Sequence, residues 1–545
     1  MNVRKTNPPV LEIRELSVSF RTFSPEGEES VINAVNKVSL SLEEGKMLAL
    51  VGESGSGKSV TALSILQLLP YPTAFHPSGM ILFNSIDLMK MRGTALEAIR
   101  GNKISMIFQE PMTSLNPLHT IEKQLAEVIT LHKKLDKIDV DKRIAELLEM
   151  VDLHQLKDRL NAYPHELSGG QRQRVMIAMA LANNPKVLIA DEPTTALDVT
   201  VQAEILALLK DLQRKLGMSI LMITHDLTIV ENMADNVAVM KNGFIVEHGL
   251  VKQVFSKPRH PYTKHLLSSA PSGNPVKIKP KSETIIKAEN FNVTFPIKTG
   301  FFNLTKRFIK AVDDAKIQIK SGHTLGVVGE SGSGKSTLAL GLLRLIKSDG
   351  LIEFLGDDLR AKNKEELRHL RQKMQIVFQD PYASLNPRLT IRETIEEGLK
   401  AHEIEEDPAK RLAIVKAALK EVGLDPEFAS RYPHEFSGGQ RQRICIARAL
   451  VLKPSFIVLD EPTSALDLST QAEIIDLLKN LQKQHNLTYL FISHDLRVIK
   501  AISHNIIVMK DGKIVEKGKA SSVFSRPKTQ YTKSLIKAAF NLEAA

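Results

Sequence analysis

The stretch GESGSGKS, residues 52–59, decides the fold of this chain of 545 residues. A short apolar run, KMLALVG (46–52), leads into it, and VTALSILQLL (60–69) follows with apolar residues at helical spacing. Its pattern is G-x-x-x-x-G-K-[ST], in which glycines let successive backbone N–H groups converge on phosphate oxygens. The lysine reaches the β- and γ-phosphates, the serine hydroxyl binds magnesium, and the start of the helix favours anions. The stretch therefore predicts a nucleotide-phosphate site between a strand and a helix.

The same eight residues return at 329–336, again behind an apolar run, TLGVVG (324–329). One match could be a chance glycine turn, but two matches in the same context make that explanation weak. Four further segments recur in the same order, namely IFQEPMTSLNP (107–117) as VFQDPYASLNP (377–387), LSGGQRQR (167–174) as FSGGQRQR (436–443), DEPTTALD (191–198) as DEPTSALD (460–467), and THDL (224–227) as SHDL (493–496). The chain is therefore a tandem repeat.

The repeat predicts two domains, a first half at 9–270 and a second half at 283–545, joined by a linker at 271–282. The linker, PSGNPVKIKPKS, is rich in Pro, Gly and Lys and lacks apolar periodicity, which indicates a solvated segment. The halves differ in length mainly between their first two motifs, with 57 residues from Gly52 to Gln109 and 50 from Gly329 to Gln379. We expect a loop insertion in that interval of the first half.

The fold class expected for each half is α/β. Continuous apolar runs such as KVLIAD (186–191) and FIVLD (456–460) are typical of buried parallel strands, and strands that alternate with helices predict a doubly wound sheet. The segments DKRIAELLEMVDL (141–153) and AKRLAIVKAALKEVGL (409–424) are amphipathic at helical spacing. They predict a helical subdomain inserted in each half.

The composition narrows the class of protein. Hydrophobic residues make up 43% and charged residues 25%, as in ordinary globular proteins, and no run approaches the roughly 20 apolar residues of a membrane span. The single cysteine, Cys445, excludes an intrachain disulfide and a four-cysteine metal site. The net charge of +11 suggests anionic partners, whereas 5% aromatics and no tryptophan argue against a base-stacking surface.

Two adjacent acids begin the repeated segments DEPTTALD and DEPTSALD, at the end of the apolar runs KVLIAD and FIVLD. Asp191 and Asp460 are expected to hold Mg²⁺, while Glu192 and Glu461 lie one residue further on and can polarise an attacking water. The alternative is a pair of charged residues at a strand end with no further role.

The SGGQ segments allow two interpretations that are compatible with each other. Ser168 and Ser437 can cap helices, with Gln171 and Gln440 reaching back as in a capping box. A serine and two glycines at the start of a helix also form a second anion site. Such a site is useful if it faces the γ-phosphate of a nucleotide bound elsewhere.

The order glycine loop, glutamine, SGGQ, acid pair, ALD and histidine resembles the ATP-binding-cassette ATPases, twice and over nearly the whole chain. The resemblance implies two tandem ABC-type P-loop NTPase domains that bind ATP and Mg²⁺ and pair head to tail within the chain. Neither half departs from the pattern of the family at a catalytic position, so both sites are expected to hydrolyse ATP.

Specific roles follow from the same resemblance. ATP on the first glycine loop is expected to be closed by Ser437, Gly438 and Gly439, and ATP on the second by Ser168, Gly169 and Gly170. Gln109 and Gln379 contact magnesium and the attacking water, His225 and His494 hold the γ-phosphate and the water, and Asp198 and Asp467 cross the interface of the paired halves. An aromatic ring should stack on adenine, for which Phe20 and Phe295 are the first candidates. They could instead be ordinary strand aromatics, and Phe23 or Phe301 could take the role.

The full set of expected site residues is as follows. The expected catalytic residues are Glu192, His225, Glu461 and His494. The expected metal ligands are Ser59, Gln109, Asp191, Ser336, Gln379 and Asp460. The expected nucleotide contacts are Phe20, Gly52, Glu53, Ser54, Gly55, Ser56, Gly57, Lys58, Ser59, Val60, Gln109, Ser168, Gly169, Gly170, Gln171 and Asp198 in the first half, and Phe295, Gly329, Glu330, Ser331, Gly332, Ser333, Gly334, Lys335, Ser336, Thr337, Gln379, Ser437, Gly438, Gly439, Gln440 and Asp467 in the second.

Three features narrow the resemblance to the peptide and nickel importers. The SLNP segments resemble the region that meets the membrane subunit, RHPYTKHLL (259–267) looks like the C-terminal extension of the oligopeptide importers, and RPKTQYTKSLI (526–536) matches that extension in part. Both cassettes lie in one chain, as in the Yej-type importers of peptides and microcin C, with fused glutathione-importer ATPases as the near alternative.

This narrower resemblance implies partners and a location. It implies two membrane permease subunits, a solute-binding protein, and a peripheral position on the cytoplasmic face of the inner (plasma) membrane. Cys445, as the only cysteine, cannot ligate the iron–sulfur cluster of many relatives. A soluble double cassette that acts on nucleic acid or ribosomes is the less favoured class, since the linker is short and zinc-binding cysteines are missing. We therefore expect neither a nucleic acid partner nor a cluster.

Overall fold

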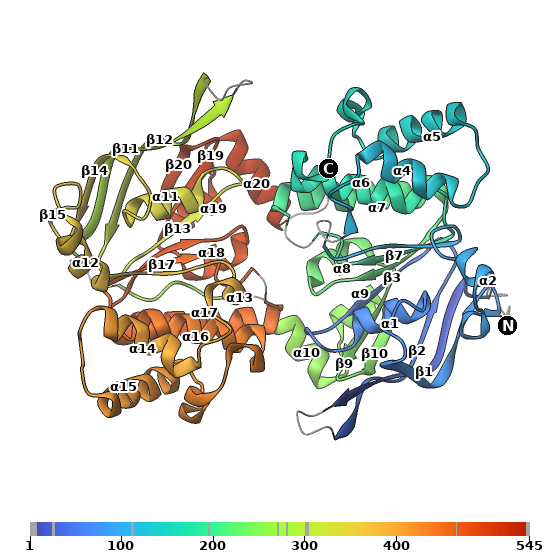
Figure 1. Cartoon of the computed structure of the whole chain (residues 1–545), viewed down its shortest axis with the longest axis horizontal. Coiled ribbons are helices and arrows are strands. Elements are labelled where there is room, and N and C mark those ends of the chain that lie inside the picture. The colour runs from blue at the N-terminus through green and yellow to red at the C-terminus, as the bar shows by residue number, and fades with distance from the viewer. Residues whose placement is uncertain are drawn as a thin grey trace. The chain divides into compact units, whose positions relative to one another are not determined.

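The computed structural model describes residues 8–23, 28–110, 114–194, 197–269, 272–278, 282–299, 305–464 and 466–540. For residues 23, 297–299 and 305–307 it describes the backbone alone. The chain divides into two compact units, one made mainly of residues up to Ser268 and the other mainly of residues from Ser269 on, together with Asp198–Thr200 (Figure 1). Within the described ranges, no helix has both the length and the apolar character that crossing a membrane requires.

Each half contains a six-stranded sheet in which every neighbouring pair but one is parallel. In the first half the order is β10 (Phe244–Leu250), β9 (Asn236–Lys241), β3 (Met47–Val51), β8 (Ser219–Ile223), β7 (Val187–Asp191) and β6 (Ile104–Ile107). In the second half it is β20 (Lys513–Lys519), β19 (Asn505–Lys510), β13 (Thr324–Val328), β18 (Thr488–Ile492), β17 (Phe456–Asp460) and β16 (Met374–Val377). The exception is the antiparallel edge strand, β10 or β20.

The central strands are buried at every position, because both faces of the sheet carry a hydrophobic core. Along β7, Val187 and Ile189 belong to one core cluster, whereas Leu188 and Ala190 belong to another. This division follows from the alternation of side chains along a strand. The two-sided apolar runs of the sequence therefore predicted these strands correctly.

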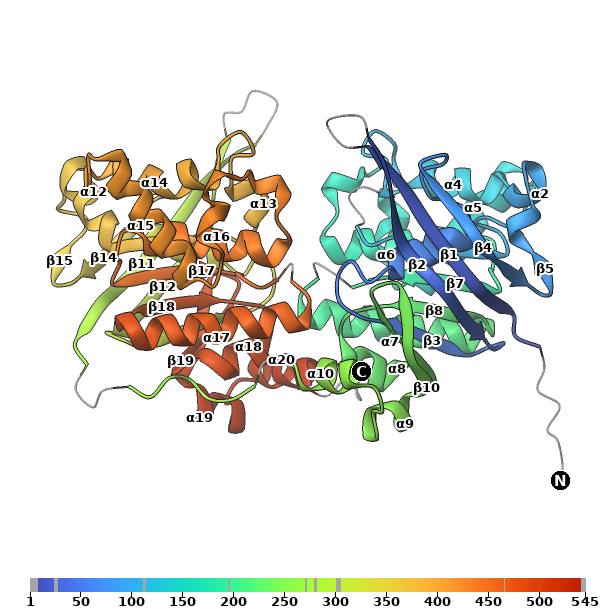
Figure 2. The ribbon, with the colours of Figure 1, turned by 90° about the horizontal axis from the view of Figure 1, so that it is seen from below.

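Each half also has a four-stranded antiparallel sheet, which the sequence analysis did not predict (Figure 2). In the first half the order is β2 (Glu29–Leu42), β1 (Leu11–Phe23), β4 (Ala74–Phe83) and β5 (Ile86–Asp87), and in the second it is β12 (Thr305–Lys320), β11 (Thr284–Thr299), β14 (Asp349–Phe354) and β15 (Asp357–Asp358). The register of β1 with β2 shifts at several points between Ile13 and Ser19. These irregularities break the alternation by which a long strand is recognised.

The extra length of the first half is not a simple loop, so that expectation is corrected. Strand β4 has 10 residues, whereas its counterpart β14 has 6. The added part of β4 pairs with β1, where Ala74 lies opposite Phe20. A backbone that finds hydrogen-bond partners along an existing strand is more stable as sheet than as an open loop. The inserted residues therefore lengthen β4, and the antiparallel sheet extends further along β1 beside Phe20.

The helical subdomains are present as predicted. In the first half, α5 (Lys137–Met150) packs against α4 (Ile121–Thr130) and α6 (Gly169–Leu181), and in the second, α15 (Pro408–Glu421) packs against α14 (Ile391–Ala401) and α16 (Gly438–Leu450). The other helices are α1 (Lys58–Ile65), α2 (Thr94–Glu97), α7 (Val199–Leu216), α8 (Leu227–Met233), α9 (Val251–Ser256), α10 (Pro261–Ser268), α11 (Lys335–Leu342), α12 (Lys364–Lys373), α13 (Pro381–Ser384), α17 (Leu468–His485), α18 (Leu496–Ile502), α19 (Ala520–Ser525) and α20 (Gln530–Phe540).

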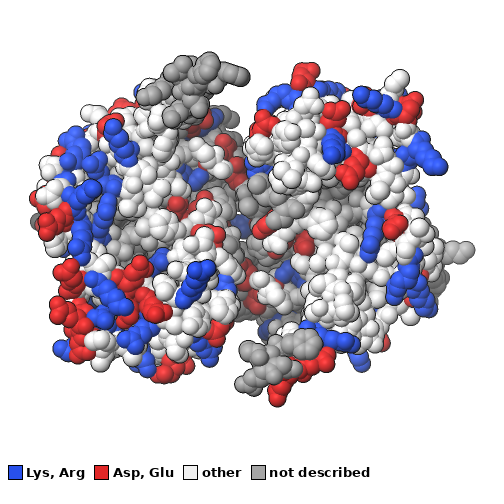
Figure 3. Space-filling view, viewed as in Figure 1, with Lys and Arg blue, Asp and Glu red and all other residues white. Residues whose placement is uncertain are grey.

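The described part of the linker, 272–278, forms neither helix nor strand and is held by the second half. Lys479 Nζ donates a hydrogen bond to the carbonyl of Ser272 (3.3 Å), and His504 Nε2 lies 2.7 Å from the carbonyl oxygen of Val276. The described linker is therefore mostly exposed, as expected, and two hydrogen bonds tie it to the second half. Elsewhere, acidic and basic side chains are interspersed over the face that Figure 3 shows, so the net charge of +11 is not gathered in one patch of that face.

Candidate active sites

The glycine loop, the glutamine, the acid pair and the histidine of each half lie at one edge of the six-stranded sheet. In the first half the glycine loop (52–59) follows β3, Gln109 follows β6, Asp191 ends β7 and His225 follows β8. These four strands are parallel neighbours, so their carboxyl ends lie together. The second half repeats this placement.

The glycine loops are shaped by residues that need positive φ. Gly55 and Gly57 have φ of 76° and 102°, and a Cβ at Gly52 would lie 2.2 Å from the carbonyl oxygen of Met240. Lys58 is buried and its ammonium donates to the carbonyl oxygens of Gly52 (2.8 Å) and Glu53 (2.7 Å). The loop therefore holds its lysine inward, at the start of α1.

The second glycine loop (329–336) has the same geometry. The ammonium of Lys335 donates to the carbonyl oxygens of Gly329 (2.9 Å) and Glu330 (2.8 Å). Burial lowers the pKa of Lys335, although nearby carboxylates such as those of Glu461 and Asp460 oppose this shift. The remaining predicted loop residues, Ser54, Ser56, Val60, Ser331, Gly332, Ser333, Gly334 and Thr337, lie in the two loops or in the first turn of the helix behind each.

A serine and an aspartate form a possible magnesium site in each half. Ser59 Oγ lies 3.2 Å from Asp191 Oδ1, and Ser336 Oγ lies 3.0 Å from Asp460 Oδ1. Burial raises the pKa of Asp191 to about 6, against the lowering effect of the Ser59 hydroxyl, and it raises the pKa of Asp460 as well. A bound cation would favour the charged carboxylate, so these oxygen ligands suit Mg²⁺.

Mg²⁺ also takes ligands that are not protein side chains. In the part of the protein that the structure describes, no group of three or more His, Cys, Asp or Glu side chains is arranged to hold a metal. Mg²⁺ commonly keeps several waters and takes phosphate oxygens of a nucleotide as ligands. The serine and aspartate pairs therefore fit a metal that arrives with its nucleotide.

A glutamine, a glutamate and a histidine meet beside each of these pairs. Gln109 Nε2 donates to Glu192 Oε2 (3.0 Å), and His225 Nδ1 lies 3.1 Å from Glu192 Oε1. In the second half, Gln379 Nε2 and His494 Nδ1 lie 2.9 Å and 3.1 Å from Glu461 Oε2. A carboxylate held by an amide and an imidazole is positioned to accept a proton from water.

The glutamate controls the charge of the histidine. Burial by itself lowers the pKa of His494, but the adjacent Glu461 carboxylate outweighs this effect and the pKa is raised; His225 beside Glu192 behaves alike. For Glu461, burial raises the pKa, but His494 and the Lys335 ammonium together more than offset this effect, so the pKa is lowered. The pair is thus most strongly charged at mildly acidic pH.

This pairing predicts a pH-dependent contribution to stability. Because the pKa of His494 is raised by folding, the pair stabilises fully below the ordinary histidine pKa, and this contribution is lost as the pH rises through the raised pKa. We expect His494→Gln to lower the melting temperature by roughly 2 °C more at pH 6 than at pH 8.5. Thermal unfolding at both pH values measures this. An equal loss of melting temperature at pH 6 and pH 8.5 would contradict the pairing. In a Glu461→Gln background, where the carboxylate is absent, His494→Gln should lower the melting temperature equally at both pH values.

The SGGQ segments form the capping boxes that the sequence predicts. The hydroxyl of Ser168 accepts a hydrogen bond from the Gln171 N–H (3.3 Å), and Gln171 Oε1 accepts one from the Ser168 N–H (3.0 Å). Ser437 and Gln440 repeat this arrangement at 3.4 Å and 3.0 Å. The boxes begin α6 and α16, whose first residues are Gly169 and Gly438.

The second glycine of each SGGQ segment lies against the next helix. A Cβ at Gly170 would lie 2.7 Å from Val201 Cγ1 of α7, and a Cβ at Gly439 would lie 2.4 Å from Thr470 Cγ2 of α17. Asp467 caps α17, since its carboxylate accepts from the Thr470 N–H (3.0 Å), and the Asp198 carboxylate accepts from the Thr200 hydroxyl (2.7 Å).

The two candidate adenine-stacking residues have different surroundings. Phe20 on β1 is half-buried and packs against the core between the sheets, with β4 alongside. Phe295 on β11 is 42% exposed, and β14 ends before it reaches this residue. The side chain of Phe23 and the whole of Phe301 lie outside the described residues. The shorter β14 explains why Phe295 is the more exposed of the two.

The described parts of the SLNP segments are anchored in the helical subdomains. Leu115 and Leu385 are each 2% exposed and belong to the subdomain cores. The side chains of Asn116 and Asn386 accept hydrogen bonds from the backbone N–H groups two residues on, each at 3.0 Å. Residues 111–113, which precede Ser114 of the first segment, lie outside the described residues.

Sequence reasoning missed one group at the sites. Tyr262 and Tyr531 contact the glycine loops, although they lie in the C-terminal segments of the two halves. The signal was the tripeptide Tyr-Thr-Lys, which both segments share at 262–264 and 531–533.

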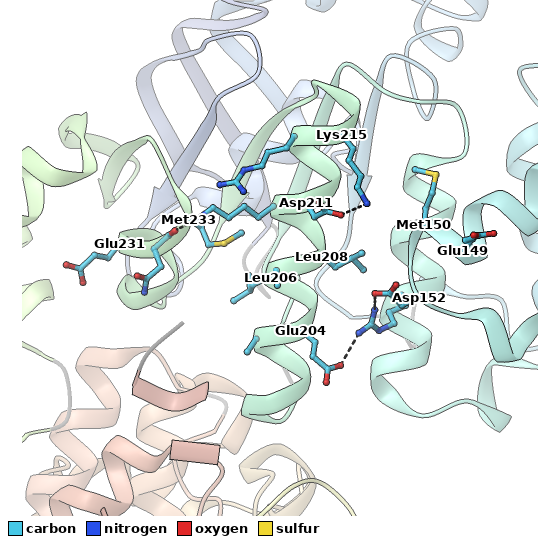
Figure 4. Close-up of a pocket in the computed structure, with 16 residues that line it drawn as sticks. Glu149, Met150, Asp152, Glu204, Leu206, Leu208, Asp211, Lys215, Glu231 and Met233 are labelled. Atoms are coloured by element: carbon cyan, nitrogen blue, oxygen red, sulfur yellow. Dashed lines mark hydrogen bonds and ion pairs between the residues drawn. The ribbon is translucent and has the colours of Figure 1, made fainter. Parts of the chain in front are cut away.

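A cavity of about 1090 Å³ in the first half lies apart from these residues. Its walls are the end of α5, α7 and α8 (Figure 4). Arg174 of α6 lies within it and pairs with Asp152 (3.2 Å) and with Glu204 of α7 (3.0 Å). None of the predicted site residues lines the cavity. It marks the junction of the helical subdomain with the sheet layer.

Comparison with known proteins places the chain in a family. The ABC transporter family matches residues 35–195 and 312–464, and the C-terminal region of oligopeptide/dipeptide transporters matches 246–294 and 515–545. The chain is 56% identical to the peptidoglycan transport ATP-binding protein YejF of Agrobacterium fabrum, over 99% of this chain and 98% of that protein. It is 53% identical to the uncharacterized ABC transporter ATP-binding protein YejF of Escherichia coli (97% and 99%).

A third relative is less similar in sequence. The chain is 44% identical to the glutathione import ATP-binding protein GsiA of Pectobacterium atrosepticum, over 97% of this chain and 89% of that protein. Two family matches in tandem, each over a P-loop NTPase fold, agree with the repeat seen in the sequence. The chain therefore belongs to the ABC transporter family, as an ATPase with two cassettes in one polypeptide and an oligopeptide/dipeptide transporter C-terminal region behind each.

Proposed function

We propose that the chain hydrolyses ATP at a site in each half and thereby powers the import of peptides or peptide-like compounds, such as microcin C, through separate membrane permeases. The observation that carries this proposal is the repetition of the site. Both halves contain a serine hydroxyl beside an aspartate. Both also contain a glutamate that lies beside a glutamine and a histidine, and the corresponding distances in the two halves are similar.

The roles of the side chains follow from their chemistry. Lys58 and Lys335 bind the β- and γ-phosphates, since each is a buried ammonium within a loop of converging N–H groups. Glu192 and Glu461 accept the proton of the attacking water, while His225 and His494 hold that water and the γ-phosphate. Mg²⁺, held by Ser59 with Asp191 and by Ser336 with Asp460, neutralises charge on the phosphates and orients them when bound. Gln109 and Gln379 would contact the magnesium ion and the attacking water.

We further propose that the two halves pair head to tail around two ATP molecules. Ser437, Gly438 and Gly439 then close the first site, and Ser168 with its two glycines closes the second. ATP binds the paired state more tightly than the separated one, so it shifts the equilibrium toward pairing. Cysteines placed by Ser59→Cys and Gly438→Cys should crosslink more with ATP in a Glu192→Gln, Glu461→Gln background. No gain with ATP would contradict head-to-tail pairing.

The solute class is supported by the C-terminal regions and by the names of the relatives. Both regions match those of oligopeptide/dipeptide transporters, and one relative is named for peptidoglycan transport. Peptide-like compounds are thus the favoured cargo, with glutathione as the second candidate because a relative at 44% identity is named for its import. The permeases and a solute-binding protein come from other chains, and this chain binds them at the cytoplasmic face of the inner membrane.

Reconstitution tests this function. The full chain is combined in liposomes with the permeases and the solute-binding protein encoded beside it, and uptake of labelled peptides is measured with ATP. We expect ATP-dependent uptake of peptides that Glu192→Gln with Glu461→Gln abolishes, whereas Glu149→Gln, an exposed change on α5, leaves it unchanged. Uptake of glutathione in place of peptides would favour the second candidate. Copurification with ribosomes or nucleic acid and not with permeases would overturn the proposal.

A further inference from the structure

A tyrosine from the C-terminal region reaches the glycine loop in both halves. The hydroxyl oxygen of Tyr262, on α10, accepts a hydrogen bond from the backbone N–H of Glu53 at 3.1 Å. The hydroxyl oxygen of Tyr531, on α20, accepts one from the N–H of Glu330, also at 3.1 Å. Two segments that differ in sequence thus make the same contact, each within its own half.

The rings of these tyrosines are fixed in place. Lys241 Nζ lies 4.6 Å from the ring centre of Tyr262, and Lys510 Nζ lies 4.9 Å from that of Tyr531. At such distances a cation is attracted by the face of an aromatic ring. Burial raises the pKa of Tyr531 to about 12, so its hydroxyl stays protonated and neutral in the physiological range.

The start of each helix is also fixed, by different residues. In the first half, His260 Nδ1 accepts from the Tyr262 N–H (3.1 Å), and the Glu247 carboxylate accepts from the N–H groups of Arg259 (2.8 Å) and His260 (3.0 Å).

In the second half, Thr529 takes the place of His260. Its hydroxyl accepts from the Thr532 N–H (3.1 Å), while Glu516 accepts from the N–H groups of Lys528 (2.9 Å) and Thr529 (3.0 Å). The helix cap has changed while the tyrosine and its contact have been kept. The capping residue is therefore exchangeable, whereas the tyrosine is the part that touches the site.

The contact acts on one peptide plane. The N–H of Glu53 and the C=O of Gly52 belong to the same planar amide, so fixing one fixes the direction of the other. Tyr262 holds that N–H, and the carbonyl on the opposite side accepts from the ammonium of Lys58 at 2.8 Å. In the second half the same amide joins Tyr531 to Lys335, with the carbonyl of Gly329 2.9 Å from Nζ.

We propose that Tyr262 and Tyr531 are positioning residues of the two nucleotide sites, whose hydroxyls orient the peptide against which the phosphate-binding lysine rests. The C-terminal region of each half is thereby built into its own phosphate loop. This inference rests on the proposed function, because it assigns the tyrosines to the same ATP sites. Without the hydroxyl, the N–H of Glu53 or Glu330 loses this hydrogen bond, and the amide that holds the lysine is oriented less firmly.

The test is the double variant Tyr262→Phe with Tyr531→Phe in the full chain, which keeps both rings and removes both hydroxyls. We expect the dissociation constant for ATP to rise about fivefold at each site, the factor that corresponds to one hydrogen bond of ordinary strength. The maximal rate of hydrolysis at saturating ATP should stay within about twofold of the parent, so the variant should raise KM and leave kcat nearly unchanged.

Tyr489→Phe is the matched control. Tyr489 on β18 is fully buried, and its hydroxyl donates to the carbonyl of Leu478 at 3.1 Å, within the core of the second half. The control removes the same group from a buried hydrogen bond and should lower the melting temperature while leaving ATP affinity unchanged.

Two results would overturn the inference. One is an unchanged ATP affinity of the double variant, and the other is a loss of affinity in Tyr489→Phe as large as in the double variant. A parent chain that binds no ATP would instead refute the proposed function, so the two failures are distinguishable.

Discussion

A chain that carries Glu192→Gln together with Glu461→Gln is expected to lose ATP hydrolysis by at least about 100-fold while it still binds ATP. Glutamine keeps the size of the side chain and one carbonyl oxygen that can accept a hydrogen bond, but its amide cannot take a proton from water. Each glutamate lies 3.1 Å from a histidine and about as close to a glutamine amide, so the replacement removes the base from this group of side chains.

Phosphate release and nucleotide binding measure this prediction. The single variants should lower turnover to similar extents, because the distances in the two halves agree within 0.1 Å for each pair. Glu149→Gln is the control, since Glu149 lies on α5 with its side chain 66% exposed. Loss of all turnover in one single variant, with none in the other, would show that the two sites are not equivalent.

The second large effect is expected from Lys58→Met with Lys335→Met. These ammonium groups are buried, and the carbonyl oxygens of its own loop hold each one in place at the expected phosphate site. Loss of a buried charge-assisted contact costs about 2–5 kcal/mol, which predicts ATP binding weaker by about 100-fold.

Equilibrium binding of a fluorescent ATP analogue measures the loss. Lys90→Met is the control, because the Lys90 side chain is 84% exposed and pairs only with the nearby Asp87 at 3.7 Å. ATP affinity equal to that of the parent would exclude these lysines from the phosphate site.

Much of the fold could be predicted because its signals are local. The strands behind Asp191 and Asp460 are continuous apolar runs, and α5 and α15 are amphipathic segments of ordinary length. The antiparallel sheets were missed because β1 and β2 carry register shifts that interrupt the alternation of apolar residues. The extra residues of the first half were taken for a loop, since sequence alone does not show that β1 has a free edge to extend along.

Some features of the sites could likewise be predicted from local sequence, and others could not. Spacing within a motif is enough to predict the glycine loops and the capping boxes of Ser168 and Ser437, since backbone geometry alone decides them. The contact of Tyr262 with Glu53 joins residues more than 200 positions apart, so the shared tripeptide marks the tyrosine but does not show what it touches. Phe20 and Phe295 occupy equivalent positions, yet their exposure differs with the length of a neighbouring strand.

The two-sided packing of β7 restricts how this enzyme can change. Val187 and Ile189 face one core, and Leu188 and Ala190 face the other, immediately before Asp191. A deletion or insertion of one residue in the strand would turn each of these side chains toward the opposite core. The position of the carboxylate is thus tied to the hydrophobic packing, and the strand can accept exchanges of residues but no change of length.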